Sequence, residues 1–164
     1  MVYTAPAGTR IGHVHLRVSD LERSIAFYRD VIGLKEQARW RDAAAFLGAD
    51  GYHHHIGLNV WSSRGAPPAD PRRPGLFHTA FVYPTRADLG RAVAHVLDCG
   101  IELTGAADHG VSEAVYLDDP DGNGIELYRD RPEADWPRDA HDALVLVNAP
   151  LDVAALVREA RVPA

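Results

Sequence analysis

The hydrophobic pattern of the first half of the chain predicts one strand, one helix and three further strands. Residues 11–18 alternate apolar and polar positions, as a half-buried strand does. Residues 21–32 then place apolar side chains at three- and four-residue intervals, the spacing of an amphipathic helix. Three short strand-like runs follow at roughly 35–40, 43–48 and 54–61. The predicted order of this half is therefore β-α-β-β-β.

The second half repeats this order. Residues 76–83 predict a strand, and a helical stripe follows between 85 and 100. Strand-like runs then occur at roughly 101–105, 114–118 and 124–129. Because an internal repeat determines how the whole chain is assigned, the sequence predicts an α+β fold made of two tandem βαβββ modules.

Short polar residues and glycines mark the ends of both predicted helices. Ser19, with Glu22 three residues later, has the pattern of a capping box, and Thr85 begins a similar cap in the second half. Gly33 stands where a chain leaving a helix adopts the left-handed conformation, and Gly100 closes the second helix. We therefore expect N-caps at Ser19 and Thr85.

Four segments follow from these patterns. They are a first module at 10–61, a linker at 62–75, a second module at 76–131 and a C-terminal extension at 132–164. Four of the linker residues are prolines, which cannot donate to a strand ladder, so a surface loop is expected there.

Composition narrows the class of protein. The chain has 164 residues, of which 46% are hydrophobic, and no run of about 20 apolar residues that would span a membrane. Its single cysteine, Cys99, excludes a disulfide framework and favours the cytoplasm. The formal net charge of -6 and the lack of a basic cluster argue against nucleic acid as a partner.

The repeat also brings metal-binding residue types into register. His13 and His78 occupy matching places early in the first strand of each half, and Glu126 in the last strand matches Gly57. If the halves pack about a pseudo-twofold axis, the two histidines and the glutamate converge in a metal-containing cleft. Two histidines and one carboxylate leave coordination positions open and suit Fe(II), Mn(II) or Zn(II).

Four segments carry a resemblance to a known family. They are GHVHLRVSDLERSIAFYRDVIGL (12–34), HHHIGLN (53–59), FHTAF (77–81) and VYLDDPDGNGIELY (115–128). Together they resemble the vicinal oxygen chelate superfamily, which includes glyoxalase I, fosfomycin and bleomycin resistance proteins and extradiol ring-cleavage dioxygenases. The resemblance implies paired βαβββ modules and a homodimer.

Within that superfamily the chain is most similar to the catechol 2,3-dioxygenase type. The extradiol signature reads here as His109, Val115-Tyr116, Asp119-Pro120, Gly122 and Glu126. One position differs, because the signature has a glycine three residues before its histidine and this chain has Ala106.

The resemblance implies Fe(II) held by His13, His78 and Glu126, with Mn(II), Zn(II) or Ni(II) as the other candidate ions. It also implies that His109 and Tyr116 hydrogen-bond the bound substrate, and that a further histidine acts as acid and base. His55 is the candidate for that role, because residues two apart in a strand share a face and Gly57 faces Glu126 across the pseudo-axis. By the same alternation His54 is expected to point away.

The activity implied is extradiol cleavage of a small catecholic aromatic by O2. Two alternatives remain open. One is a glyoxalase-like metal-dependent lyase or isomerase, although a second carboxylate ligand would be needed near Gly57. The other is a binding protein that sequesters an aromatic or drug-like ligand without turnover.

Overall fold

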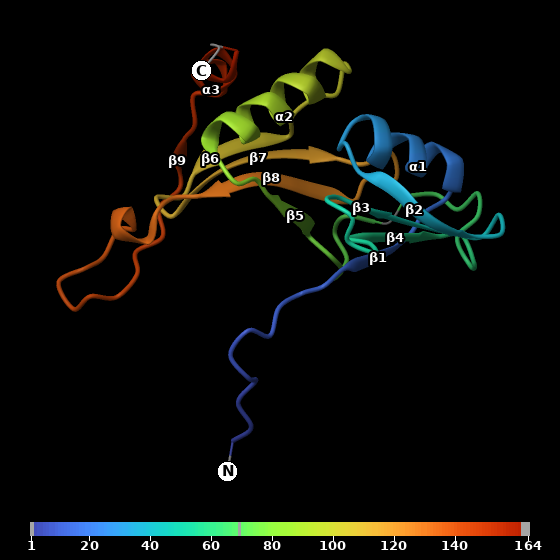
Figure 1. The fold of residues 1–164 in the computed structure, drawn as a ribbon, viewed down its shortest axis with the longest axis horizontal. Helices are drawn as coiled ribbons and strands as arrows, with labels where there is room; N and C mark the ends of the chain where they lie inside the picture. Colours follow the sequence, from blue (N-terminus) through green and yellow to red (C-terminus); the bar gives the residue numbers. More distant parts are fainter. Residues whose placement is uncertain (1, 69, 162–164) are drawn as a thin grey trace. The chain divides into compact units, whose positions relative to one another are not determined.

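The chain forms two compact units, Met1–Pro67 and Pro68–Ala164. The structure is a computed structural model that describes residues 2–68 and 70–161 (Figure 1). The boundary between the units falls inside the segment 62–75 that the sequence predicts as a linker. Each unit has its own sheet and its own helix on that sheet, so the α+β prediction is confirmed.

The first unit is a four-stranded sheet with one helix. Its elements are β1 (Val14–Arg17), α1 (Leu21–Asp30), β2 (Lys35–Trp40), β3 (Ala44–Gly48) and β4 (Ile56–Asn59). The strand order is β1-β4-β3-β2, with β1 parallel to β4 and the other pairs antiparallel. Strand β1 is shorter than the predicted 11–18, because its pairing with β4 begins at Val14.

The start of α1 differs from the prediction by one residue. Asp20, not Ser19, is the N-cap, and its side chain accepts a hydrogen bond from the backbone N–H of Arg23 at 3.0 Å. Ser19 instead accepts a hydrogen bond from the Arg23 guanidinium at 2.9 Å. Gly33 has a φ of 86°, so the predicted left-handed conformation is confirmed.

The second unit repeats this topology and adds a strand. Its elements are β5 (His78–Val82), α2 (Arg86–Asp98), β6 (Gly105–Asp108), β7 (Ser112–Asp118), β8 (Gly124–Asp130), η1 (Glu133–Asp135), β9 (Ala149–Pro150) and α3 (Val153–Ala160). The strand order is β5-β8-β7-β6-β9. The predicted cap at Thr85 is confirmed, because its side chain accepts from the Asp88 N–H. The strand predicted at 101–105 is wrong, since pairing with β7 begins at Gly105 and runs through small alanines that give little strand signal.

Each sheet has a covered face and an open face. In β8, Ile125 and Leu127 are 1% exposed, and α2 contacts this strand. Successive side chains of a strand point to opposite faces, so Glu126 lies on the face away from α2. In the first unit α1 contacts β3 and β4, where Leu47, Ile56 and Leu58 are fully buried. The open face of each sheet is therefore where polar chemistry can reach a ligand.

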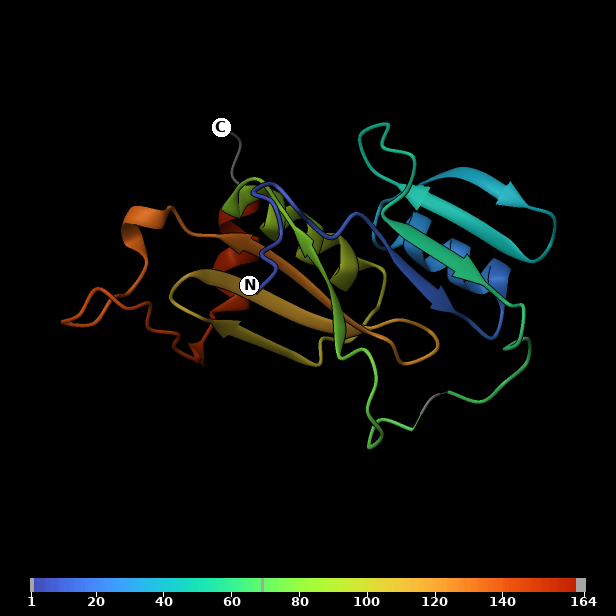
Figure 2. The ribbon, with the colours of Figure 1, turned by 90° about the horizontal axis from the view of Figure 1, so that it is seen from below.

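The C-terminal extension is part of the second unit. Strand β9 pairs with the edge of β6, and α3 packs on α2 (Figures 1 and 2). The helices approach closely at Gly90, where an added Cβ would lie 2.6 Å from the Leu156 carbonyl oxygen. We call residues 132–148, between β8 and β9, the C-terminal arm; it extends away from the sheet in both views.

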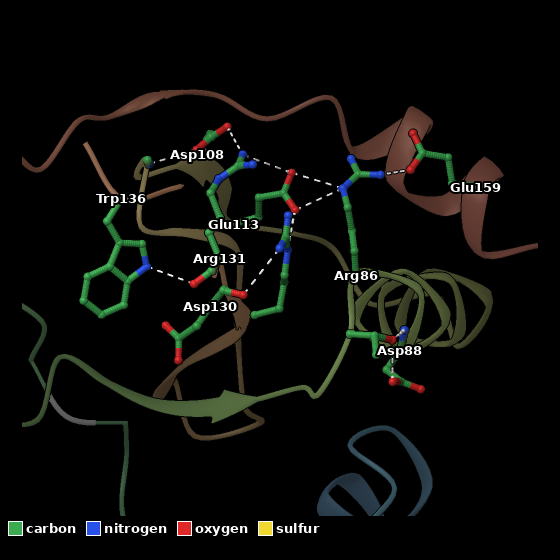
Figure 3. Close-up of polar contacts among 11 residues, drawn as sticks. Arg86, Asp88, Asp108, Glu113, Asp130, Arg131, Trp136 and Glu159 are labelled. Atoms are coloured by element: carbon green, nitrogen blue, oxygen red, sulfur yellow. Dashed lines mark hydrogen bonds and ion pairs between the residues drawn. The ribbon is translucent and has the colours of Figure 1, made fainter. Parts of the chain in front are cut away.

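A buried carboxylate ties these elements together. Glu113, in β7, is 4% exposed and accepts hydrogen bonds from Arg129 Nε at 2.8 Å and Arg86 Nε at 3.0 Å (Figure 3). Arg86 also pairs with Glu159 of α3. Arg131 lies 3.4 Å from Glu113 and 2.5 Å from Asp108 of β6, which links β6, β7, β8, α2 and α3. No sequence pattern predicts this network, because its members are far apart along the chain.

Candidate functional site

Strand register identifies equivalent positions on the two open faces. Ile56 pairs with Val14 in the first unit, and Ile125 pairs with Thr79 in the second. One step along, Gly57 pairs with His15, and Glu126 pairs with Ala80. His13 and His78 each immediately precede the first of these paired positions, and the predicted equivalences of the histidines and of Gly57 with Glu126 agree with this register.

The second unit brings three predicted site residues into contact. His78 Nε2 lies 3.1 Å from Glu126 Oε2, and the Tyr116 hydroxyl donates to Glu126 Oε1 at 3.0 Å. Tyr116 and Glu126 are directly opposite each other in β7 and β8. The three side chains thus come from three adjacent strands and meet on the open face, where the Glu126 side chain is only 13% exposed.

A fourth predicted residue extends this group. His109 Nε2 lies 2.8 Å from the Tyr116 hydroxyl oxygen. The other ring nitrogen, Nδ1, lies 3.2 Å from the backbone carbonyl oxygen of Val147 in the C-terminal arm. His109, Tyr116, Glu126 and His78 therefore form one continuous polar chain, which we call the second-unit chain.

The electrostatics of this chain favour a neutral tyrosine. Burial, together with the hydrogen bond to Glu126 and its negative charge, raises the pKa of Tyr116 to about 12. Tyr116 therefore remains a hydrogen-bond donor at neutral pH. His78 has a buried Nδ1 with no hydrogen-bond partner among the described residues, so the ring is held through Nε2.

His78 and Glu126 fit two ligands of one metal ion. Nitrogen and oxygen ligands bind such ions at about 2.0–2.2 Å, which places adjacent ligand atoms about 3 Å apart. The observed separation of 3.1 Å matches that spacing. Two ligands do not complete a site, and among residues 2–68 and 70–161 no group of three or more His, Cys, Asp or Glu side chains is arranged to hold an ion. The third predicted ligand, His13, belongs to the first unit.

At the positions where the second unit has carboxylate and hydroxyl side chains, the open face of the first unit has aromatic and imidazole rings. Phe46 pairs with Gly57 as Tyr116 pairs with Glu126, so phenylalanine stands in the tyrosine's place. The His15 ring fills the space that a side chain at Gly57, the position equivalent to Glu126, would occupy. A Cβ on Gly57 would lie 2.9 Å from that ring. A residue larger than glycine would have to displace that imidazole.

Aromatic and imidazole rings gather on this open face. The His15 ring lies 5.8 Å from that of Phe46 and 5.6 Å from that of Trp61. Trp61 is 64% exposed, which leaves its face accessible. Burial, followed by the charge of His13, lowers the pKa of His15. These rings were not predicted as site residues, although aligning β3 with β7 would have identified Phe46.

The expected orientation of His54 is wrong. Its ring lies 4.5 Å from the His13 ring and 5.0 Å from the Phe46 ring, on the face that was assigned to His55. His55 instead accepts a hydrogen bond at Nδ1 from the Ala49 N–H at 3.2 Å. Strand β4 begins only at Ile56, and the preceding turn does not follow strand alternation.

His55 lines a hollow of about 630 Å³ in the first unit. Its other lining residues come from the turn before β4 and the segment before β1: Arg10, Ile11, Gly12, Ala49, Asp50, Gly51 and Tyr52.

Burial and the charges of neighbouring histidines, His13 first, lower the pKa of His54, which favours its neutral form near pH 7.

Sequence comparison finds relatives of this chain that are named as dioxygenases. A catechol-2,3-dioxygenase from Bacillus subtilis (strain 168) is 41% identical over 152 residues, covering 93% of this chain and 52% of that protein. Biphenyl-2,3-diol 1,2-dioxygenase 3 from Rhodococcus globerulus is 36% identical over 121 residues, covering 74% and 63%. This chain therefore spans between half and two thirds of the length of these relatives.

A solved structure has the same fold. A glyoxylase/bleomycin resistance protein/dioxygenase domain from Frankia sp. EAN1pec superposes with a TM-score of 0.63 at 26% identity, covering 75% of this chain and 98% of that domain. Among the described helices of this chain, none has the length and apolar character needed to cross a bilayer. Residues 10–127 match the Glyoxalase/Bleomycin resistance protein/Dioxygenase superfamily, and the chain belongs to that superfamily.

Proposed function

We propose that this protein is a metal-dependent extradiol dioxygenase that cleaves a small catecholic aromatic with O2. The observation that carries the proposal is the second-unit chain, in which a histidine and a carboxylate lie at ligand spacing beside a tyrosine held protonated. The 41% identity to a catechol-2,3-dioxygenase supports the same reaction class.

His78 and Glu126 are the proposed metal ligands of the second unit, and His13 is the proposed third ligand. Two imidazoles and one carboxylate favour Fe(II), with Mn(II), Zn(II) and Ni(II) as alternatives. When bound, the ion would lower the pKa of a coordinated hydroxyl and offer adjacent positions to two reactants. Glu126 would contribute negative charge that offsets part of the ion's charge.

The protein's own residues would then handle protons and orientation. Tyr116 donates a hydrogen bond to the Glu126 carboxylate, so its hydroxyl is placed to orient a substrate oxygen beside that carboxylate. His109 adjoins the tyrosine and can exchange a proton with it. The acid–base histidine was predicted as His55; contact with His13 and a lowered pKa support His54 as the stronger candidate.

The ring face of the first unit supports an aromatic substrate. Phe46 and Trp61 present apolar surface beside His15, and offset or edge-to-face contacts between aromatic rings contribute about 0.5–1.5 kcal/mol each. We further propose a cytoplasmic homodimer, as the low cysteine content and the family resemblance imply.

Glyoxalase-like isomerisation is the second candidate, because the superfamily includes that activity. It would require a second carboxylate ligand at the position equivalent to Glu126. That position is Gly57, and the His15 ring occupies the space above it. A ligand-sequestering protein is the third candidate, and it would need neither the metal nor the tyrosine.

Metal reconstitution distinguishes the three candidates. Protein freed of metal by a chelator is loaded anaerobically with Fe(II), Mn(II), Zn(II) or Ni(II), and O2 uptake is then followed with a panel of catechols. The proposal predicts uptake with Fe(II) or Mn(II) that depends on the catechol. Isomerisation of a glutathione hemithioacetal with Zn(II) or Ni(II), without O2 uptake, would support the isomerase. Tight aromatic binding without any metal would support sequestration.

A further inference from the structure

The C-terminal arm touches the second-unit chain at one atom. The carbonyl oxygen of Val147 lies 3.2 Å from His109 Nδ1, and the Val147 N–H donates to the His109 carbonyl at the same distance. A peptide carbonyl can only accept a hydrogen bond. His109 Nδ1 must therefore carry the hydrogen, and in the neutral ring Nε2 is left with its lone pair.

This tautomer determines whether His109 Nε2 is a hydrogen-bond acceptor or a donor toward Tyr116. The tyrosine hydroxyl has one hydrogen, which it donates to Glu126 Oε1 at 3.0 Å. In this tautomer His109 Nε2, 2.8 Å from the hydroxyl oxygen, is a second acceptor to which the same hydrogen can turn. With the opposite tautomer, Nε2 would be a donor and could not receive that hydrogen. The arm thus gives His109 the form that can accept a proton from Tyr116.

A glycine allows the arm to pack against the turn that carries His109. Gly110 has a φ of 77°, and an added Cβ would lie 2.7 Å from Pro137 Cγ and 2.9 Å from Val147 Cγ2. The Val145 N–H donates to the Pro137 carbonyl at 2.9 Å, which holds the two sides of the arm together. Only a residue without a side chain lets both arm residues pack against the turn that carries His109.

A second contact anchors the base of the arm. The Trp136 indole N–H donates to the Arg131 carbonyl at 2.9 Å (Figure 3). Arg131 is itself held by Asp108 and Glu113. The arm is therefore fixed to the sheet at one end and to His109 at the other.

We propose that the C-terminal arm is a positioning element, in which the Val147 carbonyl holds His109 as the Nδ1–H tautomer with Nε2 directed at Tyr116. Its effect on turnover rests on the proposed dioxygenase function, whereas the tautomer itself can be measured without any activity.

The test is nitrogen-15 NMR of the histidine rings in the full-length chain, with and without Zn(II), above pH 7. The His109 signals are assigned by their loss in His109→Gln. The expected result is a protonated Nδ1 and an unprotonated Nε2. A His109 ring protonated at Nε2, alone or together with Nδ1, overturns the proposal.

Gly110→Ala displaces the arm by steric contact. We expect a mixture of His109 tautomers and, in the Fe(II)-loaded enzyme, a kcat at least about tenfold lower with KM changed less than about twofold. Gly100→Ala is the matched control, because Gly100 also has a positive φ, 76°, but nothing lies within 4 Å of its added Cβ. It should leave the His109 signals unchanged.

A rescue variant separates displacement of the arm from backbone strain. Adding Pro137→Ala and Val147→Ala to Gly110→Ala removes both colliding atoms but keeps the positive φ and the carbonyl. The Nδ1–H signal and kcat should then return. If Gly110→Ala alone retains the wild-type tautomer, the arm does not set it and the proposal is wrong. Absence of turnover in the wild type would count against the dioxygenase function and leave the NMR result standing.

Discussion

Replacing Glu113 with glutamine should destabilise the second unit strongly. The change keeps the size of the side chain but removes the negative charge that faces Arg86, Arg129 and Arg131. Two of the contacts are short, 2.8 Å to Arg129 and 3.0 Å to Arg86, and the carboxylate is buried. The three guanidinium groups would then face a neutral amide, although Arg86 would keep Glu159 and Arg131 would keep Asp108 as ion-pair partners.

The magnitude follows from these contacts. Hydrogen bonds to charged groups contribute about 1.5–3 kcal/mol each, and removing one partner of a buried ion pair costs about 3–5 kcal/mol. The arginine side chains are 14–30% exposed, so water partly replaces the lost partner. We therefore expect a loss of about 3 kcal/mol in the free energy of unfolding, a large part of the 5–15 kcal/mol typical of a native domain.

Urea unfolding measures this loss, with hydrogen exchange of peptides from each unit to show where it falls. A loss of this size lowers the midpoint by at least about 1 M. Peptides of α2, β7, β8 and α3 should lose protection, while those of the first unit should not. The matched control is Asp42→Asn, whose partner Arg64 lies 3.7 Å away at the surface; it should change stability by less than about 0.5 kcal/mol. A Glu113→Gln protein within about 1 kcal/mol of wild type would refute the reasoning.

Three further predictions concern the site. Glu126→Gln should lower bound iron at least about tenfold by elemental analysis, whereas His141→Ala, in the exposed arm, should not; equal iron in both would remove Glu126 from the metal. In the metal-free protein the raised pKa of Tyr116 gives a stabilisation of the fold that is complete below about pH 10 and is lost as the pH rises through about 12. Tyr116→Phe should therefore flatten the fall in the free energy of unfolding over that range. His54→Ala should lower turnover more than His55→Ala; the reverse order would restore the predicted assignment.

Much of the fold was predictable because it depends on local patterns. The helix periodicity, the cap at Thr85 and the left-handed Gly33 are properties of neighbouring residues, and each was confirmed. Strand β6 was misplaced because its position depends on pairing with β7 rather than on its own side chains. The repeat was readable for the same reason, since both halves keep the same hydrophobic order.

The candidate site was predictable where the repeat or the family motif constrained it. His78, Tyr116 and Glu126 come from adjacent strands with fixed register, so their contact follows once the sheet forms. His54 was misassigned because it lies in a turn, where alternation does not hold. The Val147 carbonyl could not be found from sequence, because a backbone atom that acts as a hydrogen-bond acceptor leaves no residue-type signal.

The most direct test of the dioxygenase proposal is mass spectrometry of the product formed by the Fe(II)-loaded protein from catechol under isotope-labelled O2. Extradiol cleavage predicts a yellow ring-opened product that carries both oxygen atoms of one O2 molecule, formed in proportion to the O2 consumed. A protein that holds iron and binds catechol but leaves the ring intact, or gives a product without label from O2, would contradict the account.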